Sequence, residues 1–585
     1  MAQIPASLQQ YDSYVTDPQW ARKFTIAWTS VVAAGVIASL PHLYRSVRQG
    51  RALTHMFGVT ESWETREYVP VEERQPSKRA KSRKFWMAIM RARAIFAWTL
   101  PGFDISVGQI LLIAGYFATL VCCILLGSEL SVNSNRAGFL GVAQLPVIFL
   151  FASKNSIISF LSPGHGYEKL NFVHRWAGRG LFLAIAIHGS IWITIDLRYN
   201  LPIIGQQKET SGISAFGVLC IIVLTSILPV RRWFYQGFFF VHTLGYAAFF
   251  VAACVHTPYV VPWIFPCLAF YGLDLLFKMI RSRVKDAVLV PVGNQMTLIN
   301  VHDCDQGWQA GQHVRLRIFF DGRMFESHPL TILNAPAPVS NISSRTLDLG
   351  SRAVGDWSRA LHAYAQREGD LILAATDKEK SQDGQTIGIP VQVMIDGPYG
   401  GCSIDLGEYE SVLLFSGGSG VTFTLGMLDD IVGRVVKLGR RGGERTKRIE
   451  FAWCIRSFGH IQWVAPMLMD IATVVAESSS LDLHITIFVT CLCDPDAVPP
   501  IPNCDVTLES ERPSVRQLIN DLIAPPVDDA ADQLRWVGLG GGLGICASGP
   551  RGLTREVSNV VAKLSLSTSV DEIGGIALHT ETFVL

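Results

Sequence analysis

Long runs of apolar residues fill the first half of the chain and become rare after about residue 282. A helix needs about 20 mostly apolar residues to cross the hydrocarbon core of a bilayer. Seven segments meet or approach that length, at 24–44, 104–127, 138–161, 170–195, 213–230, 235–257 and 261–280. The third contains Lys154 and Asn155, and the fifth is short. The pattern predicts a helical membrane bundle of about seven spans.

The orientation of these spans follows from the basic residues between them. The first apolar segment lacks the basic-then-apolar order of a cleaved signal peptide, so we expect a retained anchor. Cytoplasmic loops are enriched in lysine and arginine. Basic clusters follow the first, fifth and seventh spans. With spans that alternate in direction, all three clusters lie on the same side of the membrane. This side is then the cytosol, which predicts an outside N-terminus and a cytosolic second half of the chain. These residues are Arg45, Arg48, Arg51, Lys78, Arg79, Lys81, Arg83, Lys84, Arg231, Arg232, Lys278, Arg281, Arg283 and Lys285.

Short alternating segments replace the long apolar runs after the seventh span. Apolar and polar positions alternate in 287–293, 296–302, 313–320, 347–351 and 391–397, as in strands with one buried face. Such a run of short strands predicts an antiparallel β-barrel. A buried strand, a glycine-rich turn and a helix follow at 411–435, and 451–456 predicts a second parallel strand. We therefore expect a β-barrel followed by a Rossmann-like α/β domain.

Composition excludes several classes of function. Charged residues make up 17% of the 585, and the mean hydropathy is +0.29, which is apolar for a soluble protein. The net charge of +1 gives no electrostatic case for a nucleic acid partner. Twelve cysteines without a CxxC pair argue against a disulfide framework and a zinc site. They fit a reducing compartment for the soluble half.

Four histidines lie inside two of the predicted spans with the same spacing. His174 and His188 are 14 residues apart in the fourth span, and His242 and His256 are 14 apart in the sixth. At about 100° per residue, this spacing returns to within roughly 40° of one helix face and rises about 21 Å. Two such helices, face to face, offer two bis-imidazole sites near opposite membrane surfaces. His174 and His242 would hold an inner haem, and His188 and His256 an outer one.

Each of these histidines also has a simpler interpretation. A single intramembrane histidine is often a hydrogen-bonded packing residue. Ionisable groups at that depth are costly and rarely lack a role, and the repeated spacing favours paired metal ligands. Two axial histidines leave iron no open position, so such haems suit electron transfer rather than gas binding.

The segment KNSIISFLSPGHGYEKLNFVHRWAGRGLFLAIAIHG (154–189) resembles a known family. Its motif residues are Lys154, Asn155, His174, Arg175, Trp176, Gly178 and Arg179. They resemble the ferric-reductase transmembrane domain that fungal metalloreductases and NADPH oxidases share, although the family usually has arginine in place of Lys154. The resemblance extends from about residue 100 to the C-terminus. It implies that Arg175 and Arg179 pair with haem propionates, while the basic bias of the inner membrane face explains them equally well.

Three segments of the predicted barrel resemble the flavin motifs of ferredoxin-reductase-like proteins. They are GQHVRL (311–316), HPLT (328–331) in place of His-Pro-Phe-Thr, and RAVGDWSRAL (352–361), where a helix N-terminus meets the pyrophosphate. The resemblance places His328 at the FAD phosphates and Thr331 near the reactive edge of the ring system. Leu330 departs from the usual aromatic residue. The implied FAD contacts are His328, Pro329, Leu330, Thr331, Arg352, Gly355 and Trp357.

The glycine-rich turn and the C-terminal segments point to a nicotinamide cofactor. Gly417, Gly418 and Gly420 let backbone amides approach a pyrophosphate at a helix N-terminus. Arg456 resembles a family arginine at the adenosine ribose phosphate, which favours NADPH over NADH, although surface pairing is an equally ordinary use. ASGPRGL (547–553) resembles the Cys-Gly-Pro motif beside the nicotinamide, with Ser548 replacing cysteine, and ETF (581–583) resembles the Glu-x-Phe near the flavin. The implied NADPH contacts are Gly417, Gly418, Ser419, Gly420, Thr422, Arg456, Gly549 and Pro550.

These elements divide the chain into four regions. Residues 1–103 form an N-terminal region with the first span and a basic cytosolic loop. Residues 104–282 form the transmembrane haem domain, 283–402 the FAD-binding barrel and 403–585 the NAD(P)H-binding α/β domain. The resemblance implies an electron route from cytosolic NADPH through FAD and two b-type haems to an external acceptor.

The acceptor separates the alternative functions. The equal histidine spacing and the extra first span resemble the metalloreductase branch of the family, and no EF-hand loop precedes the spans. The resemblance therefore implies reduction of a ferric or cupric chelate. An NADPH oxidase that makes superoxide, a reductase of an organic pathway intermediate, and a channel whose soluble half senses nucleotide are the alternatives. We expect a plasma-membrane protein whose partners are NADPH, an external metal chelate and membrane lipid. A metal permease or a second copy of the chain would be a further partner, and we expect no nucleic acid.

Overall fold

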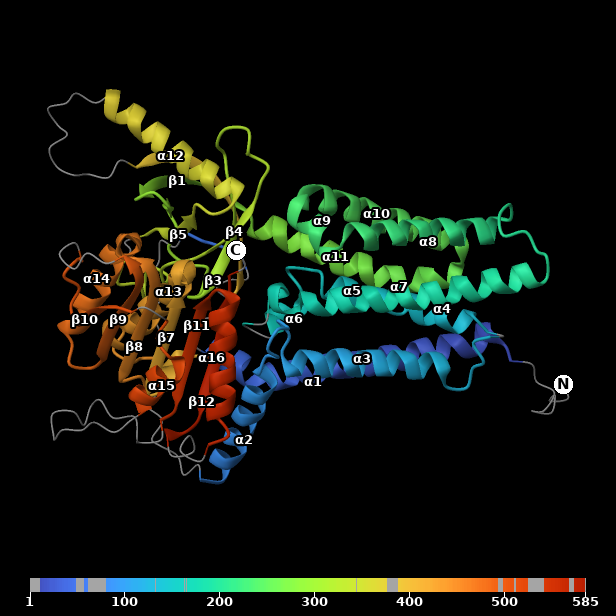
Figure 1. Ribbon diagram of the computed structural model, residues 1–585, viewed down its shortest axis with the longest axis horizontal. Coiled ribbons are helices and arrows are strands. Elements are labelled where there is room, and N and C mark those ends of the chain that lie inside the picture. The colour runs from blue at the N-terminus through green and yellow to red at the C-terminus, as the bar shows by residue number, and fades with distance from the viewer. Residues whose placement is uncertain are drawn as a thin grey trace. The chain divides into compact units, whose positions relative to one another are not determined.

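Long helices and two sheets make up the part of the chain that the computed structural model describes (Figure 1). The described residues are 11–48, 57–61, 80–131, 133–161, 164, 166–342, 345–375, 388–492, 498–509, 512–523, 541–567 and 573–583. The chain divides into two units, Met1–Leu40 with Ile110–Leu276, and Pro41–Gln109 with Phe277–Leu585. The first contains both histidine pairs, and the second contains both sheets.

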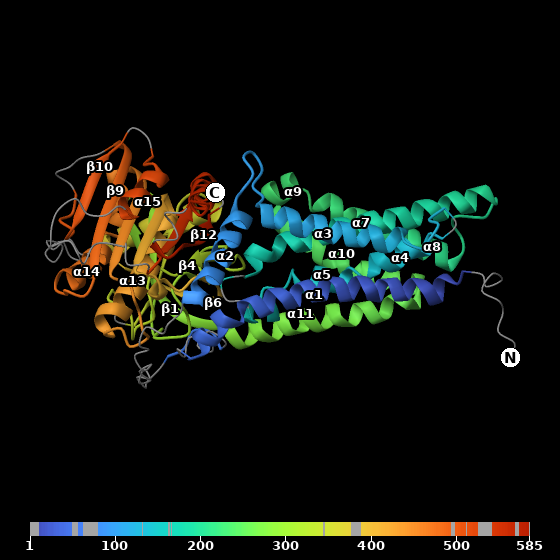
Figure 2. The ribbon, with the colours of Figure 1, turned by 90° about the horizontal axis from the view of Figure 1, so that it is seen from below.

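Six helices of the described chain are long and apolar enough to cross a bilayer. They are α1 (Ser13–Arg48), α3 (Val107–Leu125), α7 (Tyr167–Arg198), α8 (Gln207–Thr225), α10 (Tyr235–His256) and α11 (Val261–Arg281). α9 (Leu228–Trp233) links α8 to α10, and Figure 2 shows the long helices running alongside one another. Large apolar side chains such as Leu111, Val251 and Phe265 are exposed on them, as lipid-facing positions are. The predicted helical membrane bundle is confirmed.

The third predicted span departs from a regular helix. α4 (Asn135–Val142), α5 (Leu145–Leu150) and α6 (Ile157–Leu161) replace the single helix expected over 138–161, so the prediction of one continuous helix was wrong. Pro146 lies in the first turn of α5, where its missing N–H breaks no helix bond. Most residues of α4 and α5 are buried. Irregular backbone at membrane depth is tolerated where protein covers it, which explains why this interior segment can break.

A buried ion pair attaches α1 to the broken segment. Arg136 of α4 and Asp17 of α1 are both fully buried, with Arg136 Nε 2.5 Å from Asp17 Oδ1. The guanidinium also donates to the Cys123 and Leu126 carbonyls at 3.1 Å, and the Tyr11 hydroxyl contacts both charged groups. Buried charges are tolerated when they are paired and their remaining hydrogen bonds are satisfied. The pair holds α1 against the rest of the bundle.

The first sheet is an antiparallel near-barrel. β1 (Arg283–Val292), β2 (Met296–Val301), β3 (Gln312–Ile318), β4 (His328–Thr331), β5 (Leu347–Arg352) and β6 (Ile389–Gly400) follow the order β4-β3-β6-β1-β2-β5. A bridge between Ile332 and Leu349 brings the two edges of the sheet together. Alternating strand residues fill the core, to which α12 (Asp356–Ala375) adds Trp357 and Leu361. The barrel expected from the alternation is confirmed.

Two parts of the segment between α1 and α3 pack on the second unit. Thr60 pairs with Gln306 beside the barrel, and Val59 is buried in the barrel core. α2 (Ala80–Ala97) lies along α16 (Arg551–Leu564), where Met90 is buried (Figure 1). The sequence predicted only a basic loop here. Arg51, Lys78 and Arg79 of that loop lie outside the described residues.

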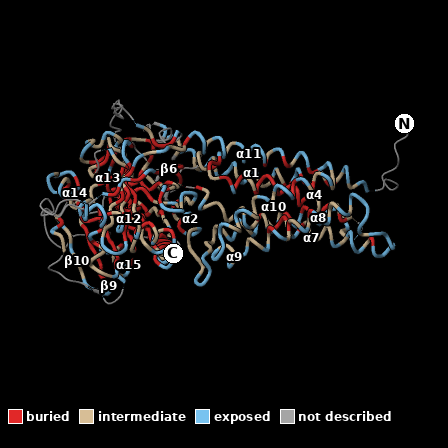
Figure 3. The backbone as a smooth tube through the Cα atoms, turned by 90° about the horizontal axis from the view of Figure 1, so that it is seen from above, coloured by how far each residue is buried: buried red, intermediate tan, exposed pale blue. Residues whose placement is uncertain are grey.

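The second sheet is parallel throughout. β7 (Ser411–Gly417), β8 (Arg448–Ser457), β9 (Asp482–Leu492), β10 (Cys504–Leu508), β11 (Leu543–Gly549) and β12 (Ile576–Thr582) are ordered β10-β9-β8-β7-β11-β12. α13 (Val421–Val432) and α14 (Ala465–Ala476) pack on one face, and α15 (Val515–Ile523) and α16 on the other. Every residue of β7 and β11 is therefore buried, and Figure 3 shows the buried residues concentrated along the strands. The predicted Rossmann-like domain is confirmed.

One edge of this sheet carries a pH-dependent contact. His484 on β9 lies between two carboxylates, with Nδ1 3.0 Å from Glu450 Oε1 and Nε2 3.0 Å from Asp505 Oδ2. The hydrogen bond to Glu450, and then the one to Asp505, raise the pKa of His484 to about 9 against the opposing effect of burial. Both ring nitrogens therefore carry protons at neutral pH.

Replacing His484 with glutamine is expected to lower thermal stability at pH 6 and to have no effect above pH 9. A histidine with a raised pKa stabilises the fold fully below its unfolded pKa of about 6.5 and loses that contribution through about pH 9. We expect a difference of about 1 kcal/mol at pH 6, because the site is partly exposed and water screens the pair. Thermal melting of the full-length protein at both pH values measures it, with the exposed His302→Gln as control. An equal loss at both pH values would contradict the ion pair.

Candidate functional site

The four paired histidines meet two by two between α7 and α10. The ring centroids of His174 and His242 are 6.1 Å apart, and those of His188 and His256 are 6.2 Å apart. Within each helix the two histidines are separated by a rise of about 21 Å. The structure therefore brings together the same two pairs that the spacing predicts, at two levels of the bundle.

Each of these rings is fixed through its Nδ1 atom. The Nδ1 of His174 lies 3.0 Å from the Ile148 carbonyl, and that of His188 lies 2.9 Å from the Ser134 carbonyl. The Nδ1 of His256 lies 2.8 Å from the Lys208 carbonyl. A carbonyl oxygen can only accept, so in these three rings Nδ1 carries the proton and Nε2 keeps its lone pair.

The fourth ring reaches the same state through a side chain. The Nδ1 of His242 lies 3.2 Å from the Ser226 hydroxyl, which donates its own proton to the Ile222 carbonyl. Ser226 must then accept from His242. All four rings thus keep an unprotonated Nε2. Proteins orient a metal-binding histidine in this way, through a hydrogen bond at the ring nitrogen that does not bind the metal.

The ring separations fit one iron ion within each pair. Two imidazoles that share a metal, each with its nitrogen about 2 Å from the ion, have centroids about 6 Å apart. Both measured separations match that value. An iron that already carried a porphyrin would have no position left for a further ligand once two histidines held it.

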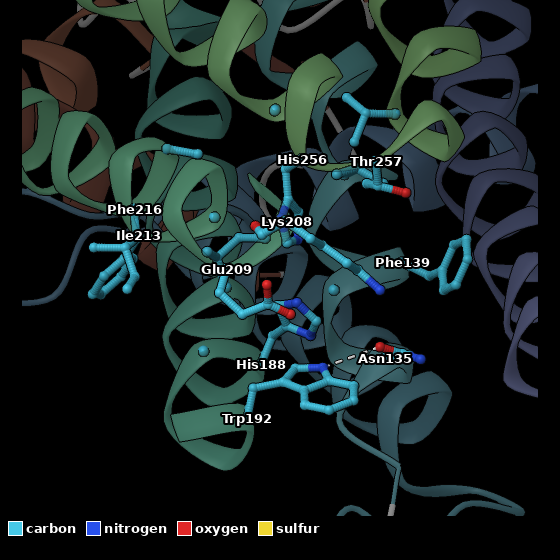
Figure 4. Close-up of a pocket in the computed structure, with 18 of the residues that line it drawn as sticks. Asn135, Phe139, His188, Trp192, Lys208, Glu209, Ile213, Phe216, His256 and Thr257 are labelled. Atoms are coloured by element: carbon cyan, nitrogen blue, oxygen red, sulfur yellow. Dashed lines mark hydrogen bonds between the residues drawn. The ribbon is translucent and has the colours of Figure 1, made fainter. Parts of the chain in front are cut away.

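A pocket opens beside His188 and His256 (Figure 4). Its empty volume is about 1380 Å³, part of it open to solvent. Lys208 and Glu209, from the start of α8, extend over the two rings, and Trp192 donates to Asn135 Oδ1 at 3.2 Å. The pocket thus combines a mostly apolar lining with the basic Lys208 and the acidic Glu209 and Asp196, beside a histidine pair.

Two glycines make room for the rings that line this pocket. A Cβ on Gly138 would lie 2.9 Å from Nδ1 of His188, and one on Gly212 would lie 2.9 Å from Nδ1 of His256. Any larger residue would push the ring away from its carbonyl partner. Neither glycine was singled out from the sequence, because a helical glycine has no distinctive pattern around it.

The inner pair has a different surrounding. Phe238 packs on His242, with ring centroids 5.4 Å apart, and the Arg179 guanidinium lies 4.3 Å from the Trp176 ring centroid. Asn155, from the family-like start of the motif segment, donates its backbone N–H to Asp274 of α11 at 2.7 Å. Polar and basic groups therefore gather at this end of the bundle.

The flavin motif residues lie at one end of the barrel. His328 of β4 stacks on Trp357 at the start of α12, with ring centroids 4.2 Å apart and planes 23° from parallel. Burial lowers the pKa of His328, against the opposing hydrogen bond to Glu326, so its imidazole is neutral at neutral pH and can donate a hydrogen bond. Trp357 is buried, and its Nε1 has no hydrogen-bond partner among the described residues. Leu330 packs against the barrel core and Thr331 is buried beside it.

The glycine turn and the C-terminal motif of the α/β domain lie against each other. A Cβ on Gly420 would be 2.3 Å from the Ser548 carbonyl, and a Cβ on Gly549 would be 3.1 Å from Gly417 N. Ser548 is fully buried, and its hydroxyl has no hydrogen-bond partner in the described chain. Phe583 donates its N–H to the Gly549 carbonyl at 3.0 Å. All these residues lie at or just after the carboxyl ends of β7, β11 and β12, at the switch point where such sheets bind ligands.

Basic side chains surround this turn. Arg352 Nη1 would lie 3.6 Å from a Cβ on Gly418, and the Arg352 guanidinium lies 5.6 Å from the Trp463 ring centroid. Burial and the charge of Arg456 lower the pKa of Arg352, and burial with both arginines lowers the pKa of His460 to about 4. Cationic groups that repel one another beside a glycine turn fit a phosphate site, because an anion would relieve the repulsion. Arg352, expected at FAD, therefore lies next to the NADPH turn as well.

A buried carboxylate that the sequence did not mark joins the two soluble domains. Asp429 of α13 accepts from Ala335 N at 2.8 Å, Ser340 Oγ at 2.6 Å and Asn341 N at 2.7 Å. Burial raises the pKa of Asp429, and these hydrogen bonds oppose the rise. The helix that follows the glycine turn is thereby fixed to the barrel. Its partners are about 90 residues away in the sequence, so no local pattern reveals the contact.

Three family models match successive parts of the chain. A ferric reductase like transmembrane component matches residues 137–253, an FAD-binding domain matches 281–403, and a ferric reductase NAD binding domain matches 409–562. The chain is therefore a multi-pass membrane protein with an FAD-binding and an NAD(P)-binding domain.

Individual relatives are more distant. Ferric/cupric reductase transmembrane component 2 of Saccharomyces cerevisiae is 24% identical over 75% of this chain and 60% of its own length. Ferric reductase transmembrane component 3 of the same yeast is 26% identical over 60% of this chain and 46% of its own. The chain thus spans between about half and two thirds of these relatives. A flavohemoglobin of Malassezia yamatoensis with bound FAD and haem aligns at 13% identity over 78% of this chain and 99% of its own, with a TM-score of 0.34.

Proposed function

The chain belongs to the ferric reductase family, and on that premise we propose that it carries electrons from NADPH across a membrane to a ferric or cupric chelate. The observation that supports this most strongly is the pair of bis-histidine sites, each with its Nε2 atoms bare. Bound FAD would convert a two-electron hydride donor into single electrons, and two bound b-type haems would carry them through the bilayer.

The histidines would hold both irons and keep them closed to other ligands. His174 and His242 would bind the inner haem, and His188 and His256 the outer one. Their Nδ1 hydrogen bonds orient the rings before any haem arrives. Because two histidines would hold each iron, the bound haems would supply electron transfer rather than ligand binding.

The soluble residues would bind and orient the two nucleotide cofactors. The turn from Gly417 to Gly420, with Thr422 at the start of α13, would donate backbone N–H groups to the NADPH pyrophosphate. Arg456 would meet the ribose phosphate, while Ser548, Gly549 and Pro550 would border the nicotinamide. Pro329, Leu330 and Thr331 would line the flavin ring system. His328, Arg352, Gly355 and Trp357 would lie at the FAD phosphates.

The acceptor would be a soluble charged complex that makes brief contact beside the outer pair. Lys208 and Glu209 reach over His188 and His256 in the pocket. No group of three metal-ligating side chains occurs anywhere in the described residues, so a resident metal site for bare iron has no support there. A chelate brings its own ligands and needs only a contact surface.

We further propose an orientation and a domain division. The basic clusters favour an outside N-terminus and FAD and NADPH domains in the cytosol. The membrane would be the plasma membrane. The haem domain would cover 104–282, the FAD barrel 283–402 and the NADPH domain 403–585, after an N-terminal region of 1–103. A metal permease or a second copy of the chain would be the partner in the membrane.

NADPH-driven reduction of a ferric chelate by the purified, haem-loaded protein tests the proposal. We expect reduction that superoxide dismutase leaves unchanged and that His188→Ala abolishes. Reduction that the dismutase abolishes would make superoxide the product and assign an oxidase. A normal bis-histidine spectrum without chelate reduction would assign an organic acceptor instead, and the absence of a haem spectrum would refute electron transfer across the bundle.

A further inference from the structure

Two cysteines meet where the barrel passes into the α/β domain. Cys402 follows β6 by two residues, and Cys546 lies in the middle of β11. Their sulfur atoms are 3.6 Å apart, although 144 residues separate them in the sequence. A disulfide has a sulfur–sulfur bond of about 2.05 Å, so a shift of about 1.5 Å would join them. No other pair of described cysteines has a sulfur–sulfur contact of this kind.

A histidine lies next to this pair. His579 is paired in register with Cys546 across β11 and β12. Its Nδ1 accepts from the Ser403 N–H at 3.0 Å, so the neutral ring carries its proton on Nε2, which lies 3.6 Å from Glu581 Oε2. The ring also stacks on Phe423 of α13, with centroids 5.4 Å apart and planes 10° from parallel. The imidazole is thus held on three sides beside the two sulfurs.

The two cysteines differ in their readiness to react. Burial alone would raise the pKa of Cys402, but the Cys546 hydrogen bond, and then the charge and hydrogen bond of His579, lower it well below its usual range. Cys402 is half-buried, whereas Cys546 is fully buried. Redox-sensing cysteines combine thiolate character, access to a small oxidant and a neighbouring thiol that resolves the first product. Cys402 has the first two properties, and Cys546 provides the third.

We propose that Cys402 and Cys546 form a reversible disulfide that slows the use of NADPH when peroxide is present. Its inhibitory effect requires only the NAD(P)-binding and FAD-binding domains and is independent of the acceptor proposed above. In the proposed orientation the pair lies in the cytosol, where disulfides are transient and regulatory rather than structural.

The reaction balances with hydrogen peroxide as oxidant. The Cys402 thiolate attacks one peroxide oxygen, the O–O bond breaks, and the sulfur becomes a sulfenic acid as hydroxide leaves. Cys546 then attacks that sulfur, the S–S bond forms, and its thiol proton leaves with the sulfenic oxygen as water. Overall, two thiols and one peroxide give one disulfide and two waters. Two electrons pass from sulfur to oxygen, and a dithiol reverses the change.

The cross-link would act on the nicotinamide end of the α/β domain. Cys546 lies two residues before Ser548 on β11, and the next residue, Gly549, packs against Gly417 of the glycine turn. A shift of about 1 Å in such a segment can cost about 10²-fold in rate. The disulfide would also tie β11 to the chain that links the two domains. We therefore expect NADPH oxidation to fall while the haem spectrum stays unchanged.

Peroxide treatment of the purified full-length protein tests the proposal. We expect a peptide cross-link between Cys402 and Cys546 by mass spectrometry, and a fall of about tenfold or more in NADPH-to-dye activity that dithiothreitol reverses. Cys402→Ser should abolish both effects and keep the untreated activity. Cys504→Ser, a half-buried cysteine on β10, should behave as wild type.

Three results would overturn the proposal. One is the absence of the cross-linked peptide after peroxide treatment, and another is inhibition that persists in Cys402→Ser. The third is a cross-link without any change in activity, which would show that the disulfide forms but does not regulate the protein. Dye reduction requires no metal chelate, so these outcomes stay separate from failure of the proposed metal reduction.

Discussion

Replacing His174 with alanine is expected to remove one of the two proposed haems, and replacing His242 as well is expected to remove no more. The two rings lie 6.1 Å apart between centroids, so they would share one iron, and loss of either ligand would release the same haem. The double variant His174→Ala/His256→Ala takes one ligand from each pair and should lose both haems. The haem-to-protein ratio of each purified variant measures the effect.

Chelate reduction should fall to background in every one of these variants. The two levels of the bundle are separated by a rise of about 21 Å, so neither site alone would carry electrons from one surface to the other. NADPH-to-dye activity should persist, since it needs only the soluble domains. Thr194→Ala is the matched control, because its side chain is exposed on α7 and bonds only to its own helix at Ser190 O. Haem losses that simply add within one pair would contradict a shared iron.

Helix geometry explains why the histidine pairs could be predicted from the sequence. A spacing of 14 residues fixes both the face and the height of a side chain on a regular helix, and α7 and α10 are regular over their whole length. The barrel strands could also be predicted, because a strand with one buried face alternates apolar and polar residues. β4 is the exception: its four residues are too few for a pattern, and it was found through a motif.

The partners of those histidines could not be predicted. Three of the four Nδ1 contacts end on backbone carbonyls, at Ser134, Ile148 and Lys208, and every residue has a carbonyl. Ile148 lies in the segment that was predicted as one helix, and Ser134 directly precedes its first piece, α4. Apolar composition alone does not distinguish a lipid-facing helix from the buried, irregular segment that α4 and α5 form. The apolar composition of residues 138–161 therefore predicts a continuous helix where the structure has separate short ones.

Long-range contacts account for the other features that the sequence did not predict. Asp17 and Arg136 are 119 residues apart, and each is an unremarkable charge in its own neighbourhood. The segment between α1 and α3 was read as a loop, yet Val59 lies in the barrel core and Met90 is buried against the α/β domain. Such contacts depend on the tertiary fold, which local periodicity does not encode.

Replacing Gly420 with alanine is expected to cut NADPH oxidation by about 10²-fold, the loss that a shift of about 1 Å near a reacting group can cause. The added Cβ would lie 2.3 Å from the Ser548 carbonyl oxygen, 2.6 Å from its carbonyl carbon and 2.9 Å from Gly549 Cα. All three are backbone atoms, so no side chain can rotate away and the turn must separate from β11. The φ of Gly420 is −59°, which suits any residue. The requirement for glycine is therefore one of space.

NADPH-to-dye kinetics of the purified variant measure this effect, with bound FAD and haem spectra recorded beside them. The spectra should match wild type, because the three atoms nearest the added methyl group all belong to β11. Gly459→Ala is the control: it lies in the same domain, and its Cβ would meet only Ser457 Oγ at an ordinary 3.8 Å. Normal kinetics in Gly420→Ala would mean that the turn and the Ser548 segment need not stay in contact during turnover. The nicotinamide site would then have to lie elsewhere along the carboxyl edge of the sheet.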